Sequence, residues 1–457
     1  MTSFLMGFKK GNMQKSMIEG NTLKLILNFS IPLLLGNLFQ QFYNVVDAAI
    51  VGQTLGSYAL AAVGASSSVQ FLILGFCMGI CQGFAIMVSQ SYGAKRLDEM
   101  QTYIYAGAVW TAVTAFVVSI LVVVFCADIL HILQVNDEIF NDAYAYLVVI
   151  FAGIPFTLLY NYLSAILRAI GDSKTPFFFL AFSAVLNIGL DFFCILVLKW
   201  GCAGAAIATI FAQAVSGILC LLLIAFKVNV LHVPKSSRYM DKKHSIKLLA
   251  MGVPMGLQFS ITAIGSMVMQ SANNALGTIY VSGFTAGMRI KSLMMCPFDA
   301  LGAAVSTFLS QNYGACKLER IHDGYHKGVM VSILYGAFAC VVMVFFGRIL
   351  SMMFVSANES QVLNASALYL RRMGYFYPIL GILITTRMSV QGLGYSARAM
   401  LAGFVEMIAR CIVALCFVPI FKYNAITWAD QTAWVAATLV LIPLWISTIR
   451  MVQKKMC

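Results

Sequence analysis

Residues 89–100 read SQSYGAKRLDEM, and residues 310–321 repeat this stretch as SQNYGACKLERI. Six of the twelve positions are identical, and two others keep their charge. Flanking landmarks recur at nearly the same separation: Ile31-Pro32 as Val253-Pro254, and Leu55-Gly56 as Leu276-Gly277. Several matches in register indicate a duplicated unit rather than a chance likeness.

The segments between these landmarks are almost wholly apolar. Of the 457 residues, 61% are hydrophobic and only 10% are charged, whereas a soluble domain has roughly 25% charged residues. A membrane-spanning helix needs roughly 20 apolar residues, and lipid cannot satisfy the open backbone of an isolated strand. We therefore predict twelve spans, at about 24–50, 57–86, 102–126, 143–167, 176–198, 203–226, 247–275, 282–309, 327–347, 366–392, 398–421 and 430–450.

The predicted fold is an all-α integral membrane protein with twelve transmembrane helices in two six-helix bundles. Six is an even number, so both halves enter the membrane from the same side and form parallel repeats. We expect an N-terminal lobe at 1–227, a polar cytoplasmic linker at 228–246 and a C-terminal lobe at 247–457. A duplicated membrane protein of this kind is typical of transporters.

The net charge of +13 reflects membrane orientation rather than nucleic-acid binding. With the N-terminus inside, 21 Lys and Arg side chains fall on the inner side of the predicted spans and five on the outer side. Basic residues favour the cytoplasmic side. We therefore predict a multi-pass protein of the cell inner membrane with both termini in the cytoplasm, and no nucleic-acid partner.

The twelve cysteines do not indicate a metal or redox site. Cys77 and Cys81 lie one helical turn apart, but no His or acidic residue accompanies them. Buried thiols of this kind usually serve as small apolar packing groups. We expect no metal centre and no cofactor.

Polar residues inside the spans are the main functional clue, because ionisable groups are costly in a membrane. In the first span Asn37, Gln40, Asn44 and Asp47 follow a helical spacing and share one face. Such a stripe should face a water-filled cavity or another helix. Alternatively, Asp47 is an interfacial carboxylate at the outer end of the span.

The fifth span carries Asn187 and Asp191, four residues apart on one face. Shielding from water and a nearby Asp47 carboxylate would both favour the neutral acid, as a proton carrier requires. The same oxygens would suit Na⁺. A purely structural Asn–Asp hydrogen bond between helices is the remaining interpretation.

The second half has no acid where Asp47 would recur, near Met269. Its polar residues include Glu406 and Arg410, whose spacing suits an ion pair. Arg289 and Lys291 are expected to snorkel from the end of their span. No basic partner can be assigned to Asp299, and Arg387 has no assignable role. We thus expect the acidic chemistry in the first lobe, and a substrate cavity with these candidate lining residues: Asn37, Gln40, Asn44, Tyr146, Gln258, Met255 and Asp299.

Four stretches carry a resemblance to a known family: NVVDAAIVG at 44–52, SQSYGA at 89–94, LRAIGDSKTP at 167–176 and SQNYGA at 310–315. In this order they resemble the multidrug and toxic compound extrusion (MATE) family over nearly the whole chain. The family comprises secondary exporters that exchange organic, often cationic, compounds for H⁺ or Na⁺ by alternating access.

The resemblance also implies an ion site. In one prokaryotic branch of the family the site lies in the first bundle, and its residues correspond here to Asp47, Asn187, Asp191 and Thr209, with Tyr146 as a further candidate. Another branch uses acids of the seventh and tenth spans, where this chain has Gln258 and the acid-free stretch 382–386. The resemblance therefore implies coupling in the first lobe and leaves the choice of H⁺ or Na⁺ open.

The sequence thus predicts a multidrug antiporter, a monomer in the lipid bilayer that acts on small organic molecules and is not an enzyme. The alternative is a flippase for a lipid-linked saccharide or another lipid-like substrate, for which Arg289, Lys291, Arg387 and Arg410 could bind a pyrophosphate. A membrane enzyme is disfavoured because the sequence has no zinc, nucleophile-elbow or phosphate-loop motif.

Overall fold

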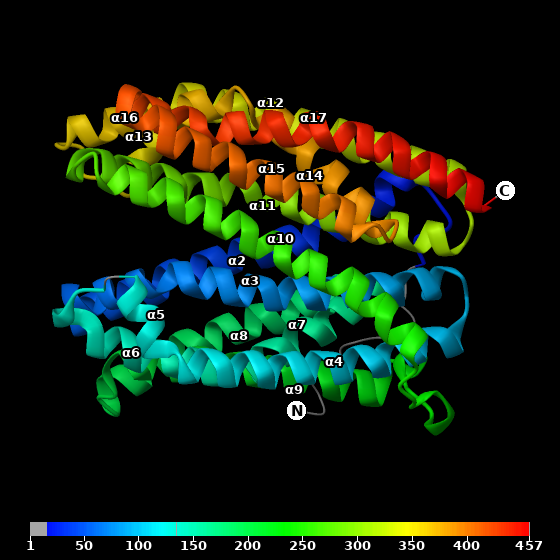
Figure 1. Cartoon of the computed structure of the whole chain (residues 1–457). Coiled ribbons are helices and arrows are strands. Elements are labelled where there is room, and N and C mark those ends of the chain that lie inside the picture. The colour runs from blue at the N-terminus through cyan, green and yellow to red at the C-terminus, as the bar shows by residue number, and fades with distance from the viewer. Residues whose placement is uncertain (1–15, 134, 457) are drawn as a thin grey trace. The chain divides into compact units, whose positions relative to one another are not determined.

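The computed structural model describes residues 16–133 and 135–456. These residues form α-helices joined by short connections, and no strand occurs among them (Figure 1). The extreme N-terminal end, for which a cytoplasmic location was predicted, lies outside the described residues. The all-helical fold class predicted from composition is confirmed.

The helices divide between two compact units, the first unit at 35–256 and the second unit at 17–34 and 257–456. Two long helices, α2 (Thr22–Leu55) and α10 (Lys242–Asn274), contribute to both units. The other helices of the first unit are α3 (Ser57–Gly93), α4 (Leu97–Val124), α5 (Cys126–Ile132), α6 (Asp137–Ala152), α7 (Ile154–Ala169), α8 (Lys174–Phe192) and α9 (Gly201–Lys227). Those of the second unit are α11 (Thr278–Gly314), α12 (Leu318–Ser351), α13 (Ser360–Gly374), α14 (Tyr377–Gly392), α15 (Ser396–Ile412), α16 (Val418–Phe421) and α17 (Tyr423–Met456).

The boundary between the units falls inside α2 and α10, two residues after Pro32 and Pro254 respectively. The predicted linker, 228–246, contains two short 3₁₀ turns, Asn229–Leu231 and Lys235–Ser237, followed by the start of α10. The division into lobes at 1–227 and 247–457 stays a prediction.

Ten single helices of the described chain are long and apolar enough to span a membrane. The predicted fourth span, 143–167, is instead two helices, α6 and α7, bent by 46°. Pro155 cannot donate a backbone hydrogen bond, and any side chain at Gly153 would overlap Ile210. The predicted tenth span, 366–392, is likewise interrupted between α13 and α14. With α6 and α7 counted as one span, eleven spans among the described helices pass this test of length and composition, and α13 and α14 lie at the position of the predicted tenth span.

Helix pairs in the first unit are joined by side chains that bond to a neighbouring backbone. Ser183 Oγ on α8 donates to the Ala212 carbonyl at 2.9 Å, and Ser216 Oγ on α9 donates back to the Phe179 carbonyl at 3.1 Å. Figure 1 shows α3, α4 and α9 running roughly parallel within this unit. The reciprocal bonds fix the register of α8 against α9, which carry much of the candidate site.

The repeated stretch at 310–321 has a structural role in the second unit. Gln311 Oε1 accepts from the Met17 amide at 2.8 Å, and Lys317 Nζ donates to the Ile18 carbonyl at 2.9 Å. Arg320 donates to the Gly20 carbonyl at 2.9 Å. The polar residues of this stretch therefore hold the chain immediately before α2.

The duplication persists in backbone detail. Lys199 and Lys422 both adopt positive φ angles, of 56° and 49°, and so do Gly171 and Gly394, at 93° each. Both pairs are separated by 223 positions. A π-helical turn follows α8 in the first repeat, at Phe193–Val197, and α15 in the second repeat, at Val413–Phe417. Such turns are rare and often lie beside functional sites.

Candidate functional site

Helix α8 presents Asn187 and Asp191 on one buried face, just before its π-helical turn. Their exposed fractions are only 2% and 0%. Asn187 Nδ2 donates to Thr209 Oγ1 on α9 at 3.4 Å, which is a long hydrogen bond. The predicted residues of the fifth and sixth spans therefore lie side by side.

Asp47 on α2 completes this group. Its carboxyl group lies close enough to that of Asp191 for one shared proton to hydrogen-bond the two. When both are ionised they have no donor between them: neither Asp191 oxygen, nor Oδ1 of Asp47, accepts a hydrogen bond from any residue that the structure describes. No Lys or Arg of the described chain forms an ion pair with either carboxylate.

Further polar side chains surround the two carboxyl groups. Tyr146 on α6 is buried and lies beside Asp47 and Asp191, within hydrogen-bonding reach of Gln70. Tyr43 on α2 lies beside the same two acids, within hydrogen-bonding reach of Gln40. The sequence analysis missed Tyr43 and Gln70. Tyr43 was recognisable, since it lies one helical turn before Asp47, whereas Gln70 carries no local signal.

A small cavity adjoins this cluster. Its volume is about 10 Å³, and its polar lining comes from Tyr43, Ser183, Asn187, Thr209 and Gln213. A space of that size accommodates about one water molecule. Two carboxyl groups with no fixed cation, in a medium of low dielectric constant, favour uptake of a proton or a small cation. Hydroxyl and amide oxygens next to them are suitable ligands for a hard cation.

Other predicted cavity residues do not join this cluster. On α2, Asn37 is half-buried and Asn44 is exposed. Met255 is buried against Ile86 and Met251 in the first unit. Gln258 of the second unit accepts a 2.7 Å hydrogen bond from Gln391 Nε2.

The second unit contains a separate cluster of charged residues, centred on Asp430 of α17. Lys291 Nζ donates to Asp430 Oδ2 at 2.6 Å, and Arg410 Nε donates to Oδ1 at 3.2 Å. The Tyr369 hydroxyl also donates to Oδ2, at 2.7 Å. All four side chains are buried. Each oxygen of this carboxylate thus has a cationic partner.

This cluster extends to Glu406, which pairs with both Arg410, at 3.6 Å, and Arg387. The pairing predicted for Glu406 and Arg410 is confirmed. The prediction that Lys291 snorkels to the membrane surface is wrong, because a buried carboxylate compensates its charge inside the fold. Asp299 is exposed and lies close enough to Arg387 for the two charges to attract each other.

Asp430 was not predicted from the sequence, and its buried carboxylate shows that the second half also contains acidic chemistry. The twelfth span was predicted to start at residue 430, which placed this side chain at the membrane surface. Helix α17 instead begins at Tyr423 and carries Asp430 two turns inside. Within the described residues, no group of His, Cys, Asp and Glu is arranged to hold a metal ion.

Comparison with known proteins agrees with the duplicated architecture. The MatE family model matches residues 32–193 and again residues 254–416. The two matches begin at Pro32 and Pro254, the same landmarks that mark the internal repeat.

Curated relatives and solved structures cover nearly the whole chain. The "Probable multidrug resistance protein YpnP" of Bacillus subtilis is 31% identical over 415 residues, 90% of each chain. A protein named "FAD transporter" from Shewanella oneidensis is 23% identical, covering 79% of this chain and 80% of its own. A structure described as an outward-facing multidrug resistance MATE family transporter superposes with a TM-score of 0.90 at 19% identity, covering 96% of this chain and 98% of its own. The chain therefore belongs to the MatE family, whose members are multi-pass membrane transporters rather than enzymes.

Proposed function

We propose that this protein is a secondary active multidrug exporter, which expels organic, mainly cationic, compounds in exchange for H⁺ or Na⁺. The observation that carries the proposal is the Asp47–Asp191 carboxyl pair, which lies beside Asn187 and Thr209 without a fixed cation. A mobile cation is the counter-charge that this arrangement lacks. The relative in Bacillus subtilis, named as a probable multidrug resistance protein, supports export as the direction.

In the proposed cycle, the outward-facing protein takes up H⁺ or Na⁺ at Asp47, Asn187, Asp191 and Thr209. Neutralising the carboxyl pair removes the repulsion between its members, which lets the surrounding helices repack and release substrate outward. Alternating access then exposes the site to the cytoplasm, where the ion leaves. The paired prolines, Pro32 and Pro254, interrupt the backbone hydrogen bonding of α2 and α10 and are natural positions for bending.

The energy available from one ion sets the concentration ratio that the exporter can maintain across the membrane. Each charge gains about 2.3 kcal/mol per 100 mV of membrane potential, and a proton gains about 1.4 kcal/mol more for each pH unit. For a neutral compound, one proton therefore supports a concentration ratio of about a hundredfold to a thousandfold. For a monovalent cation the one-to-one exchange is electroneutral, so only the pH difference contributes, about tenfold for each pH unit. We propose that a monomer in the cell inner membrane, with both termini in the cytoplasm, is the functional form.

Transport into proteoliposomes under separately imposed H⁺ and Na⁺ gradients tests the proposal. We expect one of the two gradients to drive accumulation of ethidium and related cationic dyes. Asp47→Asn and Asp191→Asn should each reduce the gradient-driven rate at least a hundredfold while inserting normally. Asp142→Asn, which removes an exposed acid of the same unit, is the matched control. Undiminished dye export in both site variants would refute the assignment.

Export of an anionic or lipid-like substrate is the second candidate, because of the relative named "FAD transporter". A pyrophosphate needs uncompensated cations, yet Lys291, Arg387 and Arg410 are each paired with a carboxylate. This pairing favours the multidrug exporter. Adding FAD and a fluorescent lipid-linked saccharide to the same assay separates the candidates, since only a substrate should accumulate under the gradient.

A further inference from the structure

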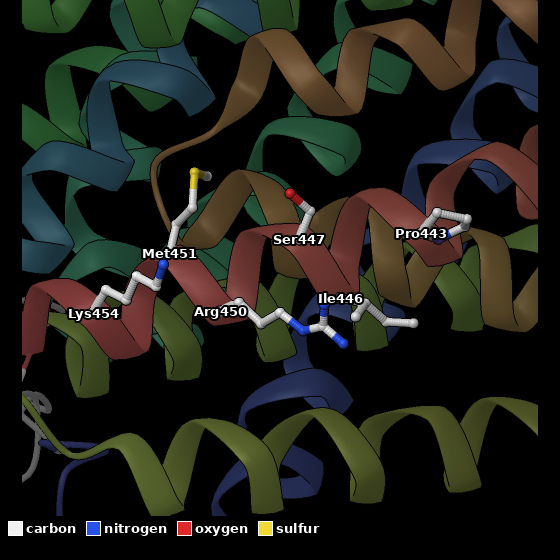
Figure 2. A pocket seen from close by; sticks show the side chains of 6 residues that line it. All are labelled: Pro443, Ile446, Ser447, Arg450, Met451 and Lys454. Carbon is white, nitrogen blue, oxygen red and sulfur yellow. The ribbon is translucent and has the colours of Figure 1, made fainter.

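The C-terminal end of α17 carries an open groove of about 440 Å³ on one face. Figure 2 shows the six side chains that line it, all from this helix: Pro443, Ile446, Ser447, Arg450, Met451 and Lys454. Their spacing places them in two adjacent rows on one face of the helix, Pro443, Ser447 and Met451 in one and Ile446, Arg450 and Lys454 in the other. The groove is thus apolar at one end and basic at the other.

The position of these rows along the span matches the layers of a bilayer. Helix α17 has 34 residues, which extend about 50 Å and exceed the roughly 30 Å hydrocarbon layer. Residues 431–449 contain no charge, and Arg450 is the first charged side chain after them. Pro443 and Ile446 therefore lie at the depth of acyl chains, Arg450 at the headgroup level, and Lys454 about 6 Å beyond it.

The positive charge at this end of the helix is uncompensated. Arg450 and Lys454 are exposed, and no described carboxylate pairs with either. Arg398 of α15 adds a third cation beside the groove. Its guanidinium contacts only neutral partners there, Ser447 Oγ at 3.3 Å and Met451 Sδ at 3.4 Å among them.

We propose that this groove, here called the α17 groove, is a specific site for one anionic phospholipid. The headgroup phosphate lies between Arg450 and Lys454, and Ser447 Oγ donates to a glycerol-ester or phosphate oxygen. One acyl chain follows Ile446 and Pro443. Basic pockets at the ends of membrane helices bind acidic headgroups in this way, and the exposed apolar half of the groove distinguishes a lipid from a free phosphate ion.

The first repeat provides an internal contrast. Lys199 and Lys422, which share a positive φ angle, are 223 positions apart. With this offset, Arg450 corresponds to Lys227 and Lys454 corresponds to Leu231. Leu231 is buried, with an exposed fraction of 2%. The second cation is therefore missing from the first repeat, and the inference predicts one such lipid site per protein rather than two.

Lipid titration of the purified full-length protein in detergent tests the inference. Dioleoyl phosphatidylglycerol, dioleoyl phosphatidylcholine and inorganic phosphate are added separately, and bound lipid is counted by native mass spectrometry while the melting temperature is recorded. We expect one retained phosphatidylglycerol and a higher melting temperature. The double variant Arg450→Ala/Lys454→Ala should bind it about thirtyfold more weakly, which corresponds to about 2 kcal/mol.

Two further variants make every outcome decisive. Lys242→Ala/Lys247→Ala removes two exposed positive charges elsewhere and should leave binding unchanged. Arg450→Lys/Lys454→Arg keeps both charges and should retain the lipid. Equal phosphatidylglycerol binding by the double alanine variant would overturn the site. An equal effect of inorganic phosphate, or of phosphatidylcholine, would overturn the assignment to an anionic lipid.

Discussion

The carboxyl groups of the two units have opposite electrostatic surroundings. In the first unit Asp47 and Asp191 face each other without any cation that the described structure supplies. In the second unit Asp430 contacts both Lys291 and Arg410. A carboxyl pair without a fixed counter-charge can bind a mobile ion and so respond to an ion gradient. A carboxylate that is already paired with a fixed cation has little tendency to bind a mobile one. We therefore propose that ion coupling belongs to the first unit and that the charged cluster of the second unit has a structural role.

Corresponding positions of the two repeats carry different side chains. With the 223-residue offset, Asn187 corresponds to Arg410 and Tyr146 corresponds to Tyr369. The tyrosines are shared, but a neutral amide in one repeat is a guanidinium in the other. Arg410 is one of the two cations that compensate Asp430, together with Lys291.

The largest expected effect is on stability in the second unit. Asp430→Asn leaves Lys291 and Arg410 without their shared carboxylate, and breaking a buried pair in this way costs about 3–5 kcal/mol. We expect a loss of that size in the free energy of unfolding, measured by denaturant titration in micelles. Asp142→Asn is the control. A loss below about 1 kcal/mol would show that this cluster is not structural.

Replacing the two corresponding tyrosines, Tyr369 and Tyr146, should lower the free energy of unfolding by smaller and unequal amounts. Tyr369→Phe removes a 2.7 Å hydrogen bond to an ionised carboxylate, which costs about 1.5–3 kcal/mol. Tyr146→Phe removes a hydroxyl that lies within hydrogen-bonding reach of the neutral side chain of Gln70 and should cost at most about 1 kcal/mol. The same unfolding titration measures both. Equal losses would contradict the electrostatic difference between the units.

Replacing Thr209 and the corresponding Thr432 by valine compares the two units at a single hydroxyl group. Thr209→Val removes the acceptor of the Asn187 amide and should lower stability by about 1 kcal/mol. Thr432→Val is the matched control at the corresponding position, where the hydroxyl bonds only to the Ala429 carbonyl of its own helix. If Na⁺ is the coupling ion, Thr209→Val should also raise its half-saturating concentration. Identical behaviour of the two variants would remove Thr209 from the site.

The smallest stability change is expected for Asp191→Asn, within about 1 kcal/mol of the wild-type protein. The carboxylate has no hydrogen-bond donor to lose, and the neutral amide relieves repulsion with Asp47. Unfolding titration is again the measurement. A destabilisation comparable to that of Asp430→Asn would mean that Asp191 has a fixed partner after all.

Much of this organisation could be predicted from the sequence, because apolar runs and the repeated stretch at 310–321 report directly on membrane spans and duplication. The stripe on α2 and the Asn187–Asp191 spacing were equally local signals. Pro155 is a local signal for the bend between α6 and α7, but the close contact of Gly153 with Ile210 was not predictable, because Ile210 lies far away in the sequence. The spacing of polar residues within one helix shows that they share a face, but it does not show which residues of other helices contact that face.

The charged cluster of the second unit shows the same limit. Lys291 and Asp430 are 139 positions apart, so nothing near either residue indicates that they pair. The predicted start of the twelfth span lies two helical turns after the start of α17. Asp430 was therefore placed at the membrane surface, and the cluster could not be recognised. Lys291 then appeared to need an exit to water, which the fold makes unnecessary.

Ion exchange on substrate binding tests the central claim most directly. Ethidium is added to purified protein in weakly buffered solution, and released H⁺ and Na⁺ are followed with a pH-sensitive dye and a sodium electrode. We predict release of about one ion per protein from the wild type, retained in Asp142→Asn and lost in Asp47→Asn/Asp191→Asn. Undiminished release from the double variant would contradict coupling at the uncompensated carboxyl pair.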